Sequence, residues 1–157
     1  MRANQEVGRL IIICGLPGSG KTTRARLLEQ ELRAIRFNAD EWMVRLGAGL
    51  WESVTRGKVE ELQWELAENL LALGHTVVIE WGTWARSERD AIRERAQALG
   101  VTVELHLLDP PLDVLFDRIQ RRNAESPAIT PDDLTKWDRQ FQRPSPEEMA
   151  LFDSVRR

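Results

Sequence analysis

The sequence of 157 residues has little cysteine, no long apolar run and no excess of basic residues. Cys14 is the single cysteine, which rules out a disulfide within the chain and predicts a small buried apolar side chain. No apolar run approaches the length of a membrane span, and residues 1–6 lack the apolar core of a secretory signal. These absences indicate a cytoplasmic protein that does not enter a membrane.

The charge balance also limits the partners. The formal net charge is -3, so no overall positive field is available to hold long nucleic acid. A short 5′-hydroxyl end could still be held locally. There is no internal repeat or low-complexity tract, and 42% hydrophobic with 30% charged residues suits a single α/β domain over residues 1–157.

The most informative stretch is residues 15–22, Gly-Leu-Pro-Gly-Ser-Gly-Lys-Thr, which fills every fixed position of G-x-x-x-x-G-K-[ST]. A β-branched apolar run at 9–14 predicts a buried parallel strand before it, and apolar spacing at 23–32 predicts an amphipathic helix after it. Strand, loop and helix N-terminus together form a cradle for a polyphosphate. The alternative is a glycine-rich turn that matches by chance. The predicted nucleotide-binding residues of the loop are Gly15, Pro17, Gly18, Ser19, Gly20, Lys21, Thr22 and Thr23.

Two acidic residues follow predicted strands. A short strand at 35–38 precedes Asp40, which either lies on the ligand-binding edge of a parallel sheet or only caps the next helix. A strand at 76–80 ends in Glu80, where P-loop proteins place a carboxylate for Mg²⁺; a solvated strand-end glutamate is the alternative. The loop predicted at 81–86 could stack a base, a sugar or an aromatic substrate on Trp81 and Trp84, or these rings could seal the core.

Helices are predicted around these segments. Residues 55–73 form a scaffold helix whose apolar stripe also lies near Trp64, a predicted packing residue. Ser87 is the predicted N-cap of the next helix, and His106, in a strand at 101–108, is expected to be a hydrogen-bonded core side chain. The apolar stripe of the helix over residues 55–73 consists of Val59, Leu62, Leu66, Leu70 and Leu73.

The last third of the chain carries a cluster of arginines. A helix over residues 112–123 ends with Arg118, Arg121 and Arg122, of which Arg118 and Arg122 share a face and could reach one polyphosphate. A solvated basic face is the alternative. Residues 118–131 are expected to form a helical lid, after which a helix begins at Pro131 and a tail follows over 144–157.

Taken in this order, the motifs resemble the small P-loop kinase group, which includes the kinase domain of polynucleotide kinase, chloramphenicol phosphotransferase, gluconate kinase and the zeta toxins. The chain looks closest to bacterial AAA-type ATP-binding proteins whose third strand ends in Asp-Phe-Gly-Phe-Trp-Ser-Arg-x-x-Arg-Asp, matched here by residues 80–90 with Glu80 in place of Asp. The resemblance implies a three-layer α/β/α P-loop NTPase sandwich with a parallel sheet in P-loop kinase order. The strand before Lys21 would be central, flanked on one side by the second and third strands, and a fifth strand would have to come from the tail.

The resemblance also implies ATP-dependent phosphoryl transfer to a hydroxyl group. Lys21 would bridge the β- and γ-phosphates, Thr22 and Glu80 would hold Mg²⁺, Asp40 would act as base, and Arg118 or Arg122 would neutralise the transferred group. The acceptor would be a small molecule, a nucleoside or nucleotide, or a nucleic-acid 5′ end. Met43 stands where polynucleotide kinase has a phosphate-binding arginine, and this difference counts against a nucleic-acid 5′ end as the acceptor. The candidate acceptor-binding residues are Asp40, Trp42, Trp81, Trp84 and Arg86.

Two other functions remain open. An ATPase or nucleotide-dependent switch could use the same loop without an acceptor, and a toxin-type binding module could hold nucleotide without turnover. The sequence predicts no oligomeric state.

Overall fold

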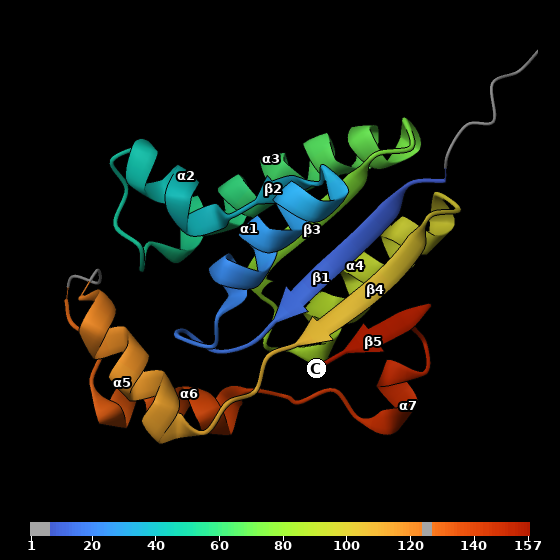
Figure 1. The fold of residues 1–157 in the computed structure, drawn as a ribbon. Helices are drawn as coiled ribbons and strands as arrows, with labels where there is room; N and C mark the ends of the chain where they lie inside the picture. Colours follow the sequence, from blue (N-terminus) through green and yellow to red (C-terminus); the bar gives the residue numbers. More distant parts are fainter. Residues whose placement is uncertain (1–6, 124–126) are drawn as a thin grey trace, which may run out of the picture.

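A parallel sheet forms the centre of the structure, a computed structural model that describes residues 7–123 and 127–157 (Figure 1). Within these residues the sheet has five strands in the order β2-β3-β1-β4-β5, and all neighbours are parallel. The predicted central strand and its two neighbours on one side are confirmed, and the tail supplies the fifth strand. The strands are β1 (Arg9–Cys14), β2 (Ile35–Phe37), β3 (Thr76–Gly82), β4 (Thr102–Leu107) and β5 (Ser154–Arg156).

Helices cover both faces of the sheet, which confirms the predicted three layers. Helix α1 lies on one face, and α3 and α4 lie on the other, whereas α5 and α6 lie beyond the carboxyl ends of β1 and β4 (Figure 1). Part of the predicted lid over 118–131 belongs to α5, and residues 124–126 lie outside the described residues, as do residues 1–6. In the part of the chain described, no helix has the length and apolar character needed to cross a membrane. The helices are α1 (Lys21–Leu32), α2 (Ala39–Arg45), α3 (Ser53–Ala72), α4 (Arg86–Ala98), α5 (Leu112–Arg122), α6 (Pro131–Gln140) and α7 (Pro146–Met149).

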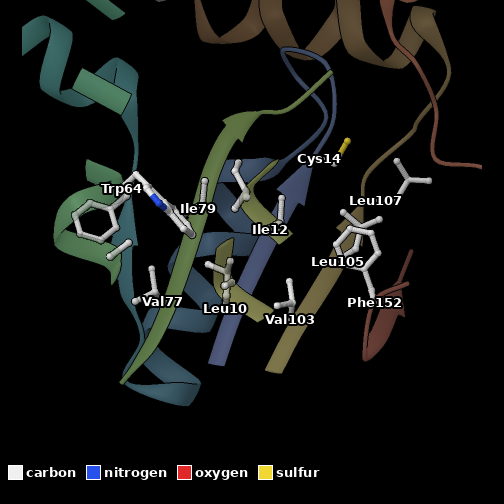
Figure 2. Packing of buried hydrophobic residues seen from close by; sticks show 14 of the residues in the cluster. Leu10, Ile12, Cys14, Trp64, Val77, Ile79, Val103, Leu105, Leu107 and Phe152 are labelled. Atoms are coloured by element: carbon white, nitrogen blue, oxygen red, sulfur yellow. The ribbon is translucent and has the colours of Figure 1, made fainter. Parts of the chain in front are cut away.

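The central strand is apolar on both faces because both faces are covered. Ile11 and Ile13 of β1 pack with Ala25 and Leu28 of α1, while the alternate residues face α3 and α4. Cys14 is fully buried on the second face, as predicted, and has a free thiol. Figure 2 shows part of this second core layer, including Leu10, Ile12, Trp64, Val77, Ile79, Val103, Leu105 and Phe152.

Helix α3 packs through a different face from the one predicted. Leu62 and Leu66 are 54% and 47% exposed, whereas Gln63 and Trp64 are buried. The buried face runs through Val59, Gln63, Ala67 and Leu71, one position away from the leucine stripe. Gln63 can be buried because its side-chain amide donates to Asn38 O (3.0 Å) and accepts from Trp81 Nε1 (2.7 Å). Both polar atoms of the Gln63 side chain are therefore hydrogen-bonded.

The other differences concern element ends and single side chains. The N-cap of α4 is Ala85 rather than Ser87, and the Glu88 side chain accepts from the Ala85 amide (3.0 Å). Trp81 belongs to β3, not to the predicted loop. His106 is a hydrogen-bonded core side chain, as predicted, with Nε2 2.5 Å from Glu104 Oε1.

Arg89 of α4 is fully buried and joins three parts of the chain. Its Nε and Nη2 pair with the two carboxylate oxygens of Glu148 at 2.6 and 2.9 Å. Nη2 also donates to Gln142 O (2.6 Å), and Nη1 donates to Thr83 O (2.8 Å) and Trp84 O (3.0 Å). All five guanidinium N–H groups therefore have acceptors, and the segment leading into α7 is fixed against the end of β3.

Replacing Arg89 by methionine should lower the free energy of unfolding by about 3–5 kcal/mol, because Glu148 would keep a buried charge without its partner. Urea denaturation followed by circular dichroism measures this change. The matched control is Arg95→Met in the same helix, whose side chain is 56% exposed and pairs with Glu68, and it should cost less than about 1 kcal/mol. Equal costs for the two variants would contradict a structural role for the buried guanidinium.

Candidate functional site

A cavity of ≈ 670 Å³ lies at the carboxyl ends of the strands, the edge at which open parallel sheets bind ligands. It brings together the phosphate loop, Asp40, Glu80, Arg118 and Arg122. It also includes residues that the sequence analysis did not single out. The lining residues come from the loop and start of α1 (Pro17, Gly18, Gly20, Lys21, Thr22, Thr23), from α2 and α3 with their connection (Asn38, Ala39, Asp40, Leu50, Trp51, Arg56, Glu60), from β3 to α4 (Glu80, Trp81, Gly82, Thr83, Trp84, Glu88) and from the region of α5 and α6 (Arg118, Arg122, Ile129).

The phosphate loop connects β1 to α1, as the sequence predicts. Gly18 and Gly20 have φ values of 80° and 98°, in the left-handed region that favours glycine. A β-carbon at Gly15 would lie 2.6 Å from Leu108 O, so only glycine fits there. Among the residues that the structure describes, no side chain caps the N-terminus of α1, which leaves its first amides available to an anion.

Lys21 lies over this loop and donates from Nζ to Leu16 O (2.9 Å). Burial lowers the pKa of the Lys21 ammonium to about 8; the nearby charge of Glu80 opposes this shift, and those of Arg122 and Arg56 add to it. A phosphate oxygen would be a stronger partner for the ammonium than the Leu16 carbonyl.

Thr22 and Glu80 meet at the floor of the cavity. Thr22 Oγ1 donates to Glu80 Oε1 (2.9 Å), and Asn38 and Arg36 donate to the same oxygen. The second oxygen, Oε2, is buried and has no hydrogen-bond partner among the described residues. Burial raises the pKa of Glu80, while Thr22, Arg36 and Asn38 oppose that rise. A hydroxyl and a carboxylate are ligands that suit Mg²⁺, so these two residues fit such an ion when it comes with nucleotide phosphates and water.

Asp40 lies in the first turn of α2 and does not cap that helix. The N-cap is Asn38, whose side chain accepts from the Glu41 amide (2.9 Å). The Asp40 side chain is 57% exposed, lines the cavity and pairs with Arg56. Arg56 Nη1 also lies 3.4 Å from Glu60 Oε1, so one guanidinium holds two carboxylates.

The two predicted arginines both reach the cavity. Arg118 Nη1 donates to Gly18 O (3.3 Å) and Ser19 O (3.4 Å), so it lies directly over the phosphate loop. Arg122, one helical turn later, also lines the cavity.

Aromatic side chains form another wall. Trp81 and Trp84 line the cavity, and Trp84 Nε1 donates to Gly15 O (3.2 Å). Trp51, from the connection between α2 and α3, also lines the cavity and stacks on Trp137 of α6 with ring centroids 5.6 Å apart. Trp137 also packs against Trp84, with ring centroids 5.8 Å apart.

Two candidate acceptor residues lie elsewhere. Trp42 does not line the cavity; its ring packs edge-on against Phe37 with centroids 6.2 Å apart. Arg86 is also outside the lining, because its guanidinium pairs with Asp90 at 3.2 Å in the first turns of α4.

Sequence reasoning missed Asn38, Arg56, Glu60 and Glu88. The sequence could have predicted Asn38 as an N-cap, since this residue stands at the end of a strand, three residues before Glu41. Arg56 and Glu60 are an i, i+4 pair within a charged helix, a pattern that usually indicates a solvated face.

Comparisons with known proteins agree with this geometry. Residues 10–144 match the AAA domain family. A gluconokinase from Arabidopsis thaliana is 26% identical over 151 residues, which cover 88% of this chain and 78% of the relative.

Solved structures share the fold of this chain. A crystal structure from Chloroflexus aurantiacus, provisionally assigned as a kinase, has a TM-score of 0.74 and 26% identity, covering 98% of this chain and 85% of that one. The APS kinase of Mycobacterium tuberculosis, in complex with AMPPNP and APS, has a TM-score of 0.62 and 22% identity, covering 80% and 78%. The chain belongs to the AAA domain family, and the solved structures that share its fold include kinases.

Proposed function

We propose that this protein transfers the γ-phosphoryl group of ATP to a hydroxyl group of an acceptor. The observation that supports this best is that the phosphate loop, Glu80 and Asp40 line one cavity. Such a cavity can hold a donor phosphate and a candidate general base together, as phosphoryl transfer requires.

The phosphates of ATP would bind along the loop amides. Lys21 would exchange the Leu16 carbonyl for phosphate oxygens, and Arg118, which donates to Gly18 O and Ser19 O, would neutralise the transferred group. Thr22 and Glu80 would hold Mg²⁺, which when bound neutralises charge on the β- and γ-phosphate oxygens.

The nucleoside part of ATP would lie in a second cavity of ≈ 550 Å³. Ser19 of the phosphate loop and Arg118 both contribute to its lining, so it adjoins the phosphate-binding loop. Arg143 contributes a cation there, and Asp109 holds it through bonds of 2.7 and 3.0 Å.

On the acceptor side, Asp40 would take the proton of the attacking hydroxyl. The hydroxyl oxygen forms a bond to the γ-phosphorus while the bond to the β,γ-bridging oxygen breaks, and ADP leaves. Arg56 pairs with Asp40 and would orient its carboxylate. The gluconokinase and APS kinase relatives support a kinase reaction in general, and the AMPPNP complex supports an adenine nucleotide as donor.

Acceptor-dependent transfer can be tested with γ-labelled ATP, Mg²⁺ and a panel of nucleosides, 5′-hydroxyl oligonucleotides, sugars and antibiotics. We expect label to appear on at least one class of acceptor. ATP hydrolysis that no acceptor stimulates would favour an ATPase or switch instead.

Asp40→Asn should lower acceptor-dependent transfer by about 10²–10⁴-fold, because the amide cannot take the hydroxyl proton. Nucleotide affinity should change little. The control is Asp117→Asn, since Asp117 has similar exposure and also pairs with an arginine but does not line the cavity. A variant at Asp40 that keeps full transfer activity would exclude this residue as the base.

Binding of Mg²⁺-ADP at pH 8 should take up about half a proton, because Lys21 is about half deprotonated there and bound phosphate restores its charge. At pH 7 the uptake should fall to about a tenth of a proton. Isothermal titration calorimetry in two buffers of different ionisation enthalpy measures the uptake. Lys21→Arg is the control, as a guanidinium stays charged at both pH values; proton release by the wild type would contradict the assignment.

A further inference from the structure

The cavity carries charges of opposite sign at its two ends. Of the four basic residues in the described lining, Lys21 belongs to the phosphate loop, Arg118 is bonded to that loop, and Arg122 lies one helical turn after Arg118 on α5. The fourth, Arg56, already holds the carboxylates of Asp40 and Glu60. The described lining therefore offers no uncommitted cation on the acceptor side.

Carboxylates predominate there instead. Glu60 from α3 and Glu88 from α4 line the cavity together with Asp40. Burial raises the pKa of Glu60; Arg56 opposes this rise, and the nearby charge of Glu88 adds to it. Two carboxylates from different helices thus face a common space, with one guanidinium shared between Glu60 and Asp40.

The described lining also includes a buried hydroxyl without a hydrogen-bond partner. Thr83 lines the cavity, is 5% exposed, and its Oγ1 has no hydrogen-bond partner among the described residues. Its backbone φ of 49° lies in the left-handed region, which is unusual for a β-branched residue and is typical of functional sites. Arg89 holds it there through the Thr83 carbonyl (2.8 Å). Trp81 and Trp84 also line the cavity.

We propose that the acceptor is an alcohol that also carries an amine, with its ammonium group bound at Glu60 and Glu88 and a ring or alkyl face on the tryptophans. A second hydroxyl of the acceptor would bond to Thr83. This inference rests on the proposed kinase function and adds the chemical class of the acceptor.

Other acceptor charges fit less well. An acid such as a sugar carboxylate would meet Asp40, Glu60 and Glu88 and would have to displace one of them from Arg56. A neutral acceptor would add no charge to offset the repulsion between Glu60 and Glu88, which Arg56 relieves only in part through Glu60. An ammonium group relieves that repulsion and can also lie against tryptophan rings through cation–π contact.

The test compares related acceptors that are cationic, neutral or anionic. The first set is D-glucosamine, N-acetyl-D-glucosamine and D-glucuronate, and the second is 2-amino-1-phenyl-1,3-propanediol with its N-acetyl derivative. Binding to the protein loaded with Mg²⁺ and AMPPNP is followed by tryptophan fluorescence, and transfer is followed with γ-labelled ATP. The amine should bind about tenfold more tightly than its N-acetyl partner in at least one set, and the acid should bind most weakly.

Charge-removing variants identify the residues responsible. Glu60→Gln and Glu88→Gln should each reduce the amine preference by several-fold, and glutamine at 88 keeps an acceptor for the Ala85 amide. Glu61→Gln is the matched control, because Glu61 is the next residue of α3, is exposed and does not line the cavity. The preference should also weaken as salt is added.

Equal binding of amine and N-acetyl compounds in both sets, tighter binding of the acid, or no binding of either amine at millimolar concentration would overturn the inference. A preference that survives in both glutamine variants would overturn the assignment to Glu60 and Glu88. Transfer to a neutral or acidic acceptor would leave the kinase proposal standing, whereas amine binding without transfer to any acceptor would count against the kinase alone.

Discussion

The arrangement of the cavity depends on one buried interaction, the ion pair between Arg89 and Glu148. Removing a guanidinium from water is costly, and here the cost is offset because all five of its N–H groups have acceptors. Two of these acceptors are the carbonyls of Thr83 and Trp84, so the same interaction fixes the wall of the cavity. Trp84 then bonds to Gly15, where the phosphate loop begins. The C-terminal segment is in this way part of the support of the site.

The charges within the cavity are held in place by partners that ligands could replace. Lys21 donates to a backbone carbonyl, which is a weaker partner than a phosphate, and Glu80 keeps one buried oxygen without a bond among the described residues. Arg56 connects Asp40 to Glu60 across two helices. Under the proposed function, one end of this site would receive the phosphates of ATP, and Asp40 at the other end would take up a proton.

The sequence predicted those features that local pattern determines, and it missed those that depend on tertiary packing. The phosphate loop follows from eight consecutive residues, and Glu80 follows from its place at the end of an apolar strand. Arg56 could not be predicted because its partner Asp40 is sixteen residues away and the two meet only through the packing of α2 on α3. Arg89 stands in a highly charged stretch, a pattern that predicts a solvent-exposed helix face rather than a buried side chain. The prediction of the buried face of α3 was wrong by one position because Gln63, a polar residue, lies in the core, where two hydrogen bonds satisfy its side chain.

The proposed reaction requires that the loop after β1 presents a nucleotide's terminal phosphate to Asp40. A crystal structure with Mg²⁺ and AMPPNP tests it most directly. We predict that the triphosphate lies along the loop amides, that Lys21 has moved from the Leu16 carbonyl to a phosphate oxygen, and that the Asp40 carboxylate faces the γ-phosphate. An empty loop, or an Asp40 side chain directed away from the γ-phosphate, would contradict the account.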